Sequence, residues 1–251
     1  ADPSTAKKIT LFDFAGQRMY YQMHHIFITP KLSIYLVVFS LEKAPDAALE
    51  GVDKECGLTQ LDNLHFWLNS VHGRAPSAPI IVVGTHRQKV SDEVAEERLR
   101  TIHQSFKRAV FRHQLCNGGQ VFCVDNAADD SNRFDELKAL IMGEQKNLQD
   151  FGTRVPLGWL RWLELVQLRG DEQMSLRQAG EIARHLNIDE QQLKLMLQLF
   201  TDVGLLMHFD VDGLRDLVVL QPRWLLNHMR NLLCLRHLDD MAGEAEDGSE
   251  K

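Results

Sequence analysis

The stretch Ile9-Thr-Leu-Phe-Asp-Phe-Ala-Gly-Gln17 guides the interpretation of the first half of this chain. It begins as an apolar run typical of a buried β-strand and ends in a turn that carries Asp13, Gly16 and Gln17. In a nucleoside triphosphate switch, an aspartate at a strand end reaches Mg²⁺, a glycine amide faces the γ-phosphate and a glutamine positions water. Asp13 is therefore a candidate magnesium ligand, Gly16 a candidate phosphate contact and Gln17 a candidate, incomplete catalytic residue. The alternative is an ordinary turn in which Asp13 caps the next helix.

The chain lacks the phosphate-cradling loop that normally precedes such a stretch. Only eight residues come before Ile9, and no Gly-Lys pair occurs anywhere in the 251 residues. No G-x-x-x-x-G-K-[ST] loop is therefore present. We expect the chain on its own to bind or hydrolyse nucleotide weakly or not at all, which leaves open whether it is an enzyme.

Composition is that of an ordinary soluble protein, with 44% hydrophobic and 25% charged residues. The net charge of −7 is a poor match to nucleic acid, and no apolar run is long enough to span a membrane. Four cysteines are widely scattered without a Cys-x-x-Cys pair, which favours free thiols in a reducing, cytoplasmic compartment. These are Cys56, Cys116, Cys123 and Cys234.

The first half alternates apolar strand-like runs with helical periodicity, which predicts an α/β unit with a parallel sheet. Strands are expected at Ile9–Phe14, Leu32–Leu41, Pro79–Gly84 and Gln120–Val124. These runs are rich in β-branched residues, as in strands covered on both faces.

The second half begins after a boundary at Gly152 to Pro156 and has a different pattern. An apolar stripe with Trp159 and Trp162 is followed by two predicted helices and a hairpin around Asp212-Gly213. The order of helix, helix–turn–helix, hairpin and helix predicts a winged helix. The helices are expected at Leu176–His185 and Asp189–Phe200, and the hairpin strands at Gly204–Phe209 and Asp216–Leu220.

A winged helix raises the alternative of an acidic, DNA-binding regulator. The second helix of the helix–turn–helix carries one lysine and two acidic residues, whereas recognition helices present Arg or Lys to DNA. Its Leu, Met and Phe residues suit packing or a protein contact instead. We therefore expect no nucleic-acid partner.

A second candidate nucleotide contact follows the Pro79–Gly84 strand, in the sequence Gly84-Thr-His-Arg-Gln88. Guanine-binding switches place Asn/Thr-Lys/His-x-Asp here, and Thr85 and His86 fit that pattern. Gln88 stands where the aspartate belongs, and a neutral amide cannot offer the two strong acceptors of a carboxylate. We therefore expect weakened guanine selectivity, the alternative being a loop without a ligand. Val124-Asp125-Asn126-Ala127, after the next strand, is generic and reads as a loop.

Taken together and in this order, the motifs resemble the Roco family, in which a Ras-like Roc domain is joined to a COR domain. The resemblance spans about Lys7 to Leu238. Its more specific parts are the Pro-x-x-Trp opening of the second half and the Gln-Pro-x-Trp-Leu near its end. The motifs are Asp13-Phe-Ala-Gly-Gln17, Phe27, Val37-Val-Phe-Ser40, Val83-Gly-Thr-His86, Val155-Pro-Leu-Gly-Trp159 and Gln221-Pro-Arg-Trp-Leu-Leu226.

The resemblance implies a truncated Ras-like parallel sheet with flanking helices, followed by the winged-helix first part of COR. The domains would be a truncated Roc domain at 7–150 and a COR subdomain at 151–238, with a tag remnant at 1–6 and an acidic tail at 239–251. It implies a guanine-nucleotide-linked switch or scaffold that uses GTP or GDP and Mg²⁺ in a longer protein, with none held by this chain. Implied partners are other domains of that protein, signalling proteins and a second copy. The alternative is a degenerate interaction scaffold without a nucleotide role.

The missing first strand of a Ras-like sheet predicts a rearranged sheet. We expect Ile9–Phe14 to pair in parallel with Leu32–Leu41, which gives four strands in sequence order, because an unpaired edge would leave backbone groups unsatisfied. One face should be thinly covered. We also expect the two halves to pack together, because the Trp159/Trp162 stripe requires cover.

Overall fold

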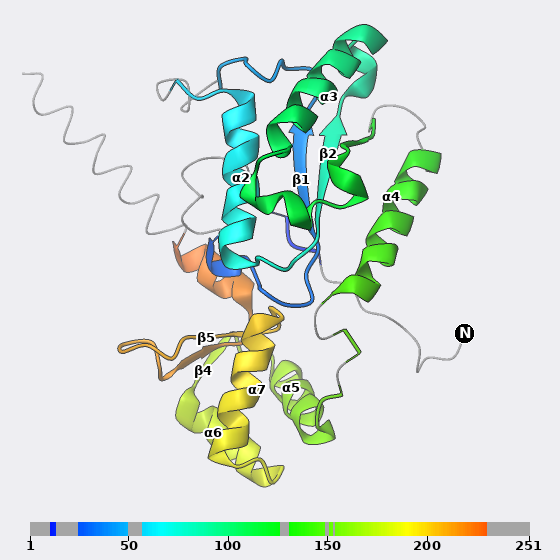
Figure 1. The fold of residues 1–251 in the computed structure, drawn as a ribbon. Helices are drawn as coiled ribbons and strands as arrows, with labels where there is room; N and C mark the ends of the chain where they lie inside the picture. Colours follow the sequence, from blue (N-terminus) through cyan, green and yellow to red (C-terminus); the bar gives the residue numbers. More distant parts are fainter. Residues whose placement is uncertain are drawn as a thin grey trace, which may run out of the picture.

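The computed structural model describes residues 11–13, 25–49, 57–125, 131–148, 151–152 and 154–229. Its elements form two units, an α/β unit from the first half of the chain and a smaller unit from the second half (Figure 1). The change of unit falls after α4 (Ser131–Glu144) and before α5 (Leu157–Arg169), where the sequence predicts a boundary.

The α/β unit contains three described parallel strands in the order β1-β2-β3. They are β1 (Tyr35–Ser40), β2 (Ile80–Thr85) and β3 (Phe122–Cys123). Tyr35 pairs with Ile80 and Ser40 with Thr85, so β1 and β2 end at the same edge. The predictions of strands within Leu32–Leu41, Pro79–Gly84 and Gln120–Val124 are confirmed, as is the parallel sheet.

Helices cover the sheet according to the alternation of its side chains. One face, with Val37, Ile80 and Val82, packs against α2 (Gln60–Arg74) and α3 (Asp92–Phe106). The other face, with Ile81 and Val83, packs against α4, which lies on the opposite side of the strands (Figure 1). Both helices of the first face begin at side-chain caps, since the Thr59 side chain accepts from Asp62 N and the Ser91 side chain accepts from Val94 N.

The first predicted strand is not formed by the residues that can be described. Residues 11–13 have no strand assignment, and the Leu11 side chain is 87% exposed. The described sheet therefore has three strands, and the prediction of a fourth beside Leu32–Leu41 is wrong for residues 11–13. Residues 9, 10 and 14 lie outside the described residues. The physical reason is burial, because an apolar strand is stabilised by the surfaces that cover its side chains, and Leu11 has almost no cover.

The sheet is least covered at β1, on the face that carries Leu36 and Val38. Leu36 and Val38 are in register with Ile81 and Val83, so the four side chains share one face. Ile81 and Val83 are buried beneath α4, whereas Leu36 is 39% and Val38 58% exposed. The expectation of one thinly covered face is confirmed, and β1 lacks the second cover that would support a neighbouring apolar strand.

The second unit has the element order of a winged helix. After α5 come β4 (Gln173–Ser175), α6 (Leu176–His185), α7 (Glu190–Asp202), β5 (Met207–His208) and β6 (Leu217–Val219), with residues 222–229 again helical. Its strands form an antiparallel sheet in the order β4-β6-β5. The helix–turn–helix and the hairpin are confirmed. The short strand β4 was not predicted, because three residues are too few for a periodic signal and Ser175 also caps α6.

The core of the second unit is built around Trp162, which is fully buried. Its indole Nε1–H donates to Ala179 O at 3.1 Å, and its ring lies 6.5 Å from that of Phe200. The cover of the tryptophan stripe therefore comes from α6 and α7 of the same unit. The two units meet, as expected from the sequence, but through a different segment from the tryptophan stripe.

Candidate functional site

The carboxyl ends of β1 and β2 bring two predicted site residues, Thr85 and His86, to one edge of the sheet. The Thr85 hydroxyl donates to Phe39 O at 3.2 Å. His86 adopts a left-handed backbone conformation, and its Nδ1 lies 3.1 Å from both Ser40 Oγ and Thr85 Oγ1. Both side chains thus bind the neighbouring strand end, which holds the turn after β2 in place.

Gln88, the third predicted contact in this turn, is positioned through its backbone. Its N–H donates to Asp125 Oδ2 at 3.0 Å, and Asp125 is 4% exposed. Asp125 follows β3 and was interpreted from the sequence only as part of a generic loop. A carboxylate that accepts a backbone N–H is a strong local restraint. Asp125 follows β3, which is parallel to and next to β2. The position of Asp125 at this edge of the sheet could therefore have been inferred from the strand order.

The charged side chains of the same turn bind nearby protein groups. Arg87 forms an ion pair with Asp92 and donates to Val90 O at 3.2 Å. Lys89 Nζ lies 3.0 Å from Glu42 Oε2, and this hydrogen bond is the main cause of the lowered pKa of Glu42. The turn is therefore rigidly held, and its neutral Gln88 amide can offer a base one acceptor and one donor group.

The candidate switch residues are only partly described. Asp13 is exposed and makes no hydrogen bond or ion pair with the rest of the described chain. Gly16 and Gln17 lie outside the described residues. No group of three or more His, Cys, Asp or Glu side chains in the described part could hold a metal ion. The Asp13 side chain is exposed, and the described residues around it do not form a metal site.

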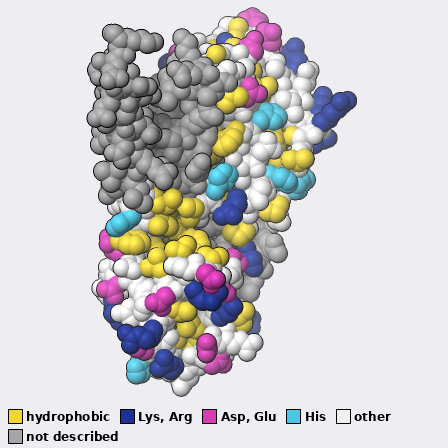
Figure 2. Space-filling view, turned by 90° about the vertical axis from the view of Figure 1, so that its left-hand side faces the viewer, with side chains coloured by type: hydrophobic (Ala, Val, Ile, Leu, Met, Phe, Trp, Pro, Cys, Tyr) yellow, Lys and Arg dark blue, Asp and Glu magenta, His cyan; other side chains and the backbone are white. Residues whose placement is uncertain are grey.

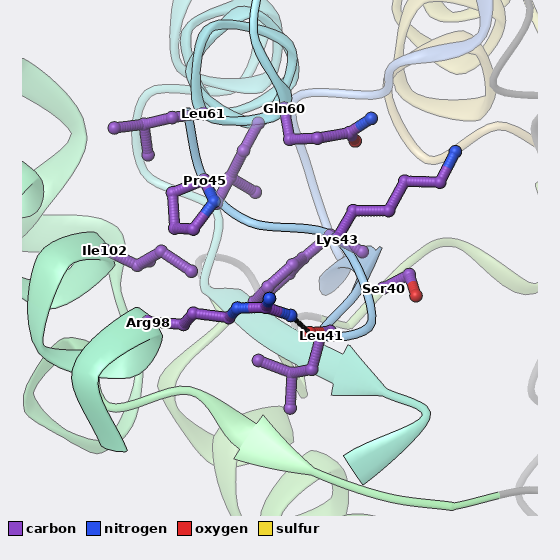
Figure 3. Close-up of a pocket in the computed structure, with 10 residues that line it drawn as sticks. Ser40, Leu41, Lys43, Pro45, Gln60, Leu61, Arg98 and Ile102 are labelled. Atoms are coloured by element: carbon purple, nitrogen blue, oxygen red, sulfur yellow. Dashed lines mark hydrogen bonds between the residues drawn. The ribbon is translucent and has the colours of Figure 1, made fainter. Parts of the chain in front are cut away.

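A small, partly open hollow lies beside the end of β1, between α2 and α3 (Figure 3). Pro45, Leu61 and Ile102 line it, and the Arg98 guanidinium donates to Leu41 O at its wall. Its volume is about 10 Å³, which is room for about one water molecule. This hollow is too small to hold a nucleotide.

The described cysteines are free thiols with low reactivity. Burial is the main cause that raises the pKa of Cys116 to about 12, and the nearby Glu144 carboxylate raises it further. Burial also raises the pKa of Cys123. Since the thiolate is the nucleophile, neither residue is suited to catalysis or to redox chemistry at neutral pH.

Residues 25–33 bridge the two units, a role that the sequence did not reveal. Towards the α/β unit, Arg74 Nε donates to His25 O at 3.0 Å and Ile28 packs against Ala75 and Ala78. The Tyr35 hydroxyl donates to Thr29 O at 2.8 Å. The segment is thus fastened to the end of α2 and the start of β1.

The same segment also enters the second unit. Phe27 is 6% exposed and packs against Met207 and Val219, and Lys31 N–H donates to Asp202 O at 3.2 Å. Residues 25–27 lie beside the helix of residues 222–229, between the two units (Figure 1). Hydrophobic side chains gather on the surface at this junction (Figure 2). Phe27 is one of the residues that carry the Roco resemblance, but the sequence alone assigned no role to it. Its large aromatic side chain was the one sign of burial.

Comparisons with known proteins match both halves. The family model described as "Ras of Complex, Roc, domain of DAPkinase" matches residues 2–88, and that described as "C-terminal of Roc, COR-A domain" matches residues 156–249. The chain belongs to the Roco family. Its α/β unit is a GTPase-type Roc module, and its second unit belongs to COR-A.

Similar proteins are much longer than this chain. The Dictyostelium discoideum protein "Probable serine/threonine-protein kinase pats1" is 23% identical over 238 residues, which cover 91% of this chain and 7% of that protein. The Caenorhabditis elegans "Leucine-rich repeat serine/threonine-protein kinase 1" is 23% identical over 265 residues, which cover 93% of this chain and 10% of that protein. The Roc–COR chain therefore spans a tenth or less of these relatives.

A solved structure has the same fold. The structure titled "Structure of methanosarcina barkeri Roco2 RocCORdC bound to GDP" has a TM-score of 0.62 and 14% identity, and the match covers 87% of this chain and 58% of that one. The fold class predicted from sequence, a Ras-like unit followed by a second small domain, is thus confirmed. Among the described helices, none has the length and apolar character needed to cross a bilayer.

Proposed function

We propose that this Roc–COR chain is the coupling element of a guanine-nucleotide-linked switch. In this proposal the Asp13–Gln17 segment senses nucleotide in a longer Roco protein, and residues 25–33 pass its state to COR-A. On its own the chain binds GTP or GDP weakly or not at all. The observation that carries the proposal is the double attachment of residues 25–33, eight residues after Gln17, with Phe27 in the second unit and Ile28 in the first.

The physical argument rests on rigidity at both ends of this segment. Phe27 is nearly fully buried. Thr29 O accepts from the Tyr35 hydroxyl of the first unit, and Lys31 N–H donates to Asp202 O of the second unit. A shift at the residues just before His25 therefore cannot be absorbed locally without moving Phe27 in its pocket or breaking these bonds. Packed interfaces respond to such shifts by discrete repacking, which is the basis of a switch.

For the longer protein we propose Asp13 as a Mg²⁺ ligand, and Gly16, Thr85, His86 and Gln88 as nucleotide contacts, with Gln17 near the attacking water. Domain bounds of 7–150 for Roc and 151–238 for the COR subdomain belong to the same proposal. Partners would be the other domains of that protein and signalling proteins. The free thiols Cys116 and Cys123 support a reducing, cytoplasmic setting.

The nucleotide part is tested by titrating the chain with a fluorescent GDP analogue in the presence of Mg²⁺. Phosphate-cradling amides and a lysine supply most of the affinity in such sites, so we expect no saturable binding at micromolar protein. Asp13→Ala should leave the titration unchanged. Tight binding that Asp13→Ala abolishes would contradict the proposal that this chain lacks a working site.

The coupling part is tested by Phe27→Ala, followed by thermal unfolding with probes in each unit. We expect the wild-type units to unfold together, and the variant to show separate transitions because its bridge to Met207 and Val219 is lost. Phe134→Ala is the control, since Phe134 lies on α4 and packs against the sheet face with Ile81 and Val83, away from the junction. It should lower stability without separating the transitions. Coincident transitions in Phe27→Ala would show that residues 25–33 do not couple the units.

Gln88 favours a second candidate function, an interaction scaffold without a nucleotide role. Its amide stands where a guanine-reading carboxylate is expected, and the turn around it is saturated by protein contacts. The upstream sequence of the natural gene distinguishes the two. An intact G-x-x-x-x-G-K-[ST] loop there supports the switch, and a degenerate one supports the scaffold.

A further inference from the structure

Positive charge is concentrated at one corner of the α/β unit, in a chain whose net charge is −7. No Asp or Glu occurs between residues 98 and 124, whereas this range holds five Lys or Arg residues and two histidines. Four of the five cations lie near the end of α3 or in the short segment that follows it, and all four are exposed. We call these four, together with the exposed Val110 among them, the basic corner: Arg100, Lys107, Arg108 and Arg112.

The rest of the chain does not neutralise the basic corner. Surface cations elsewhere, such as those of α4, pair with neighbouring carboxylates. In the part of the chain that the structure describes, the side chains of Arg100, Lys107 and Arg108 form no ion pair or hydrogen bond. Arg112 donates to Lys107 O at 3.2 Å, a contact that leaves its charge uncompensated. The helix dipole of α3 favours cations in its last turn, but Arg108 and Arg112 lie beyond its end at Phe106.

The basic corner is an exposed turn on a firmly held base. Val110 is 64% exposed, whereas the next residue, Phe111, is 1% exposed and packs in the core of this unit. The Gln114 side chain donates to Ala75 O and Ala78 O, both at 2.7 Å. These two buried anchors fix a short segment that presents one apolar side chain among cations.

The corner lies away from the candidate nucleotide contacts and close to the junction of the two units. Helix α3 begins after the turn that holds Gln88 and runs back along the sheet (Figure 1). The segment after it reaches the opposite edge, where Leu115 bridges to Ile80 at the start of β2. The loop that accepts from Gln114 also packs against Ile28 of the junction. A partner bound at the corner would therefore leave the nucleotide edge accessible.

We propose that the basic corner binds the surface of an anionic bilayer, with Val110 entering the headgroup region. A flat anionic surface contacts all four cations of an exposed turn at once, and the headgroup boundary accepts an apolar side chain flanked by cations. Each Lys or Arg near such a surface strengthens binding by about fivefold. Four cations and one valine make a weak site, so we expect half-saturation at about 0.1–1 mM accessible anionic lipid.

The first experiment is flotation of the whole chain with phosphatidylcholine vesicles that contain, or lack, phosphatidylserine. We expect binding only where phosphatidylserine is present, and we expect added salt to weaken it because the cations are exposed. A chain of net charge −7 has no general attraction to these vesicles, so binding requires a local basic surface. Absence of binding to the phosphatidylserine vesicles overturns the proposal, as does equal binding to pure phosphatidylcholine.

The second experiment locates the contact by charge reversal. The double variant Lys107→Glu, Arg108→Glu should weaken vesicle binding by about tenfold or more. The control is Arg161→Glu, Arg184→Glu, which makes the same change in net charge at exposed residues of the second unit. It should bind within about threefold of wild type. All four sites are exposed, so both variants should fold, which far-UV circular dichroism checks. Equal effects of the two double variants would rule out the basic corner as the binding surface.

The third experiment distinguishes a bilayer from a soluble acidic partner. Val110→Ser should weaken vesicle binding by about threefold or more, because it removes the apolar side chain that enters the headgroup region. Leu195→Ser is the matched control, since Leu195 is 56% exposed on α7, and it should leave binding unchanged. Unchanged vesicle binding in Val110→Ser would contradict insertion at this point. Binding of soluble polyglutamate as tight as vesicle binding, at equal concentrations of negative charge, would assign the corner to an acidic protein segment and overturn the membrane proposal.

Discussion

Thr29 and Gly204 touch where the two units of the chain meet. A Cβ atom at Gly204 would lie 3.0 Å from Thr29 Cγ2, and Gly204 has a φ of +73°. The position therefore requires glycine twice over, once for its left-handed backbone and once for the close approach of the first unit.

Gly204→Ala should destabilise the chain more than Gly170→Ala does. Gly170 also follows a helix and has a φ of +71°, but nothing lies within 4 Å of its added Cβ. At either position, forcing alanine into the left-handed backbone conformation should lower the free energy of unfolding by about 1–2 kcal/mol. A further loss of about 1–3 kcal/mol at Gly204 should come from overpacking against Thr29. Urea unfolding of the two variants measures the difference.

The Thr29→Ser change should rescue Gly204→Ala, because it removes the Cγ2 methyl and keeps the hydroxyl. The rescue should be absent when Thr29→Ser is combined with Gly170→Ala. Equal losses at the two glycines would mean that the units do not press together at this point in solution.

Trp162→Ala should lower the free energy of unfolding by about 3–5 kcal/mol, because the ring is fully buried and a large cavity would result. Trp162→Phe should cost less, since it keeps most of the apolar volume but leaves Ala179 O without its donor at 3.1 Å. Chemical denaturation followed by far-UV circular dichroism checks both. A wild-type midpoint in Trp162→Ala would show that the ring is exposed in solution.

Asp125→Ala should destabilise the turn after β2, because the Gln88 N–H loses its carboxylate acceptor. The free energy of unfolding should fall by about 1–3 kcal/mol. Asp125→Asn keeps an oxygen acceptor and should lose less. Asp135→Ala is the control, since Asp135 is exposed in a surface pair with Lys138 and should change stability by no more than about 0.5 kcal/mol. Hydrogen exchange at Gln88 should rise in Asp125→Ala, and unchanged exchange would refute this role.

His65 should make stability fall with acid. Burial between Phe106 and Phe111 is the main cause that lowers its pKa, and the nearby Asp62 opposes this only in part. As pH falls through about 6.5, the unfolded chain takes up the proton first, so the free energy of unfolding decreases and then levels off below the folded-state pKa. Its Nε2 lies 2.8 Å from Ser105 Oγ, a contact that glutamine can imitate.

The measurement is urea unfolding of wild type and His65→Gln between about pH 5 and 8. The variant should show a shallower loss of stability on acidification, whatever its stability at neutral pH. Parallel curves would show that His65 does not cause the acid sensitivity.

Elements whose signal is local could be predicted from the sequence. The β-branched run of β2 and the apolar spacing of α2 and α3 are short-range patterns, so their places follow from nearby residues alone. The helix start at Ser91 and the turn at Asn187, which has a φ of +57°, are likewise local preferences of single residue types. The ordered motifs, read together, were sufficient to predict the Roco family.

Other features were decided only when the chain folded. Asp125 meets Gln88 across 37 residues, and Phe27 reaches Met207 and Val219 from the far end of the chain. An apolar run also predicts burial without specifying the covering surface, so the sequence could not show that Trp162 is covered by α6 and α7 of its own unit. Leu11 was expected in a buried strand, yet it is 87% exposed. The physical reason is that hydrogen bonding and burial depend on which surfaces meet, and residue pattern specifies only that a surface requires cover.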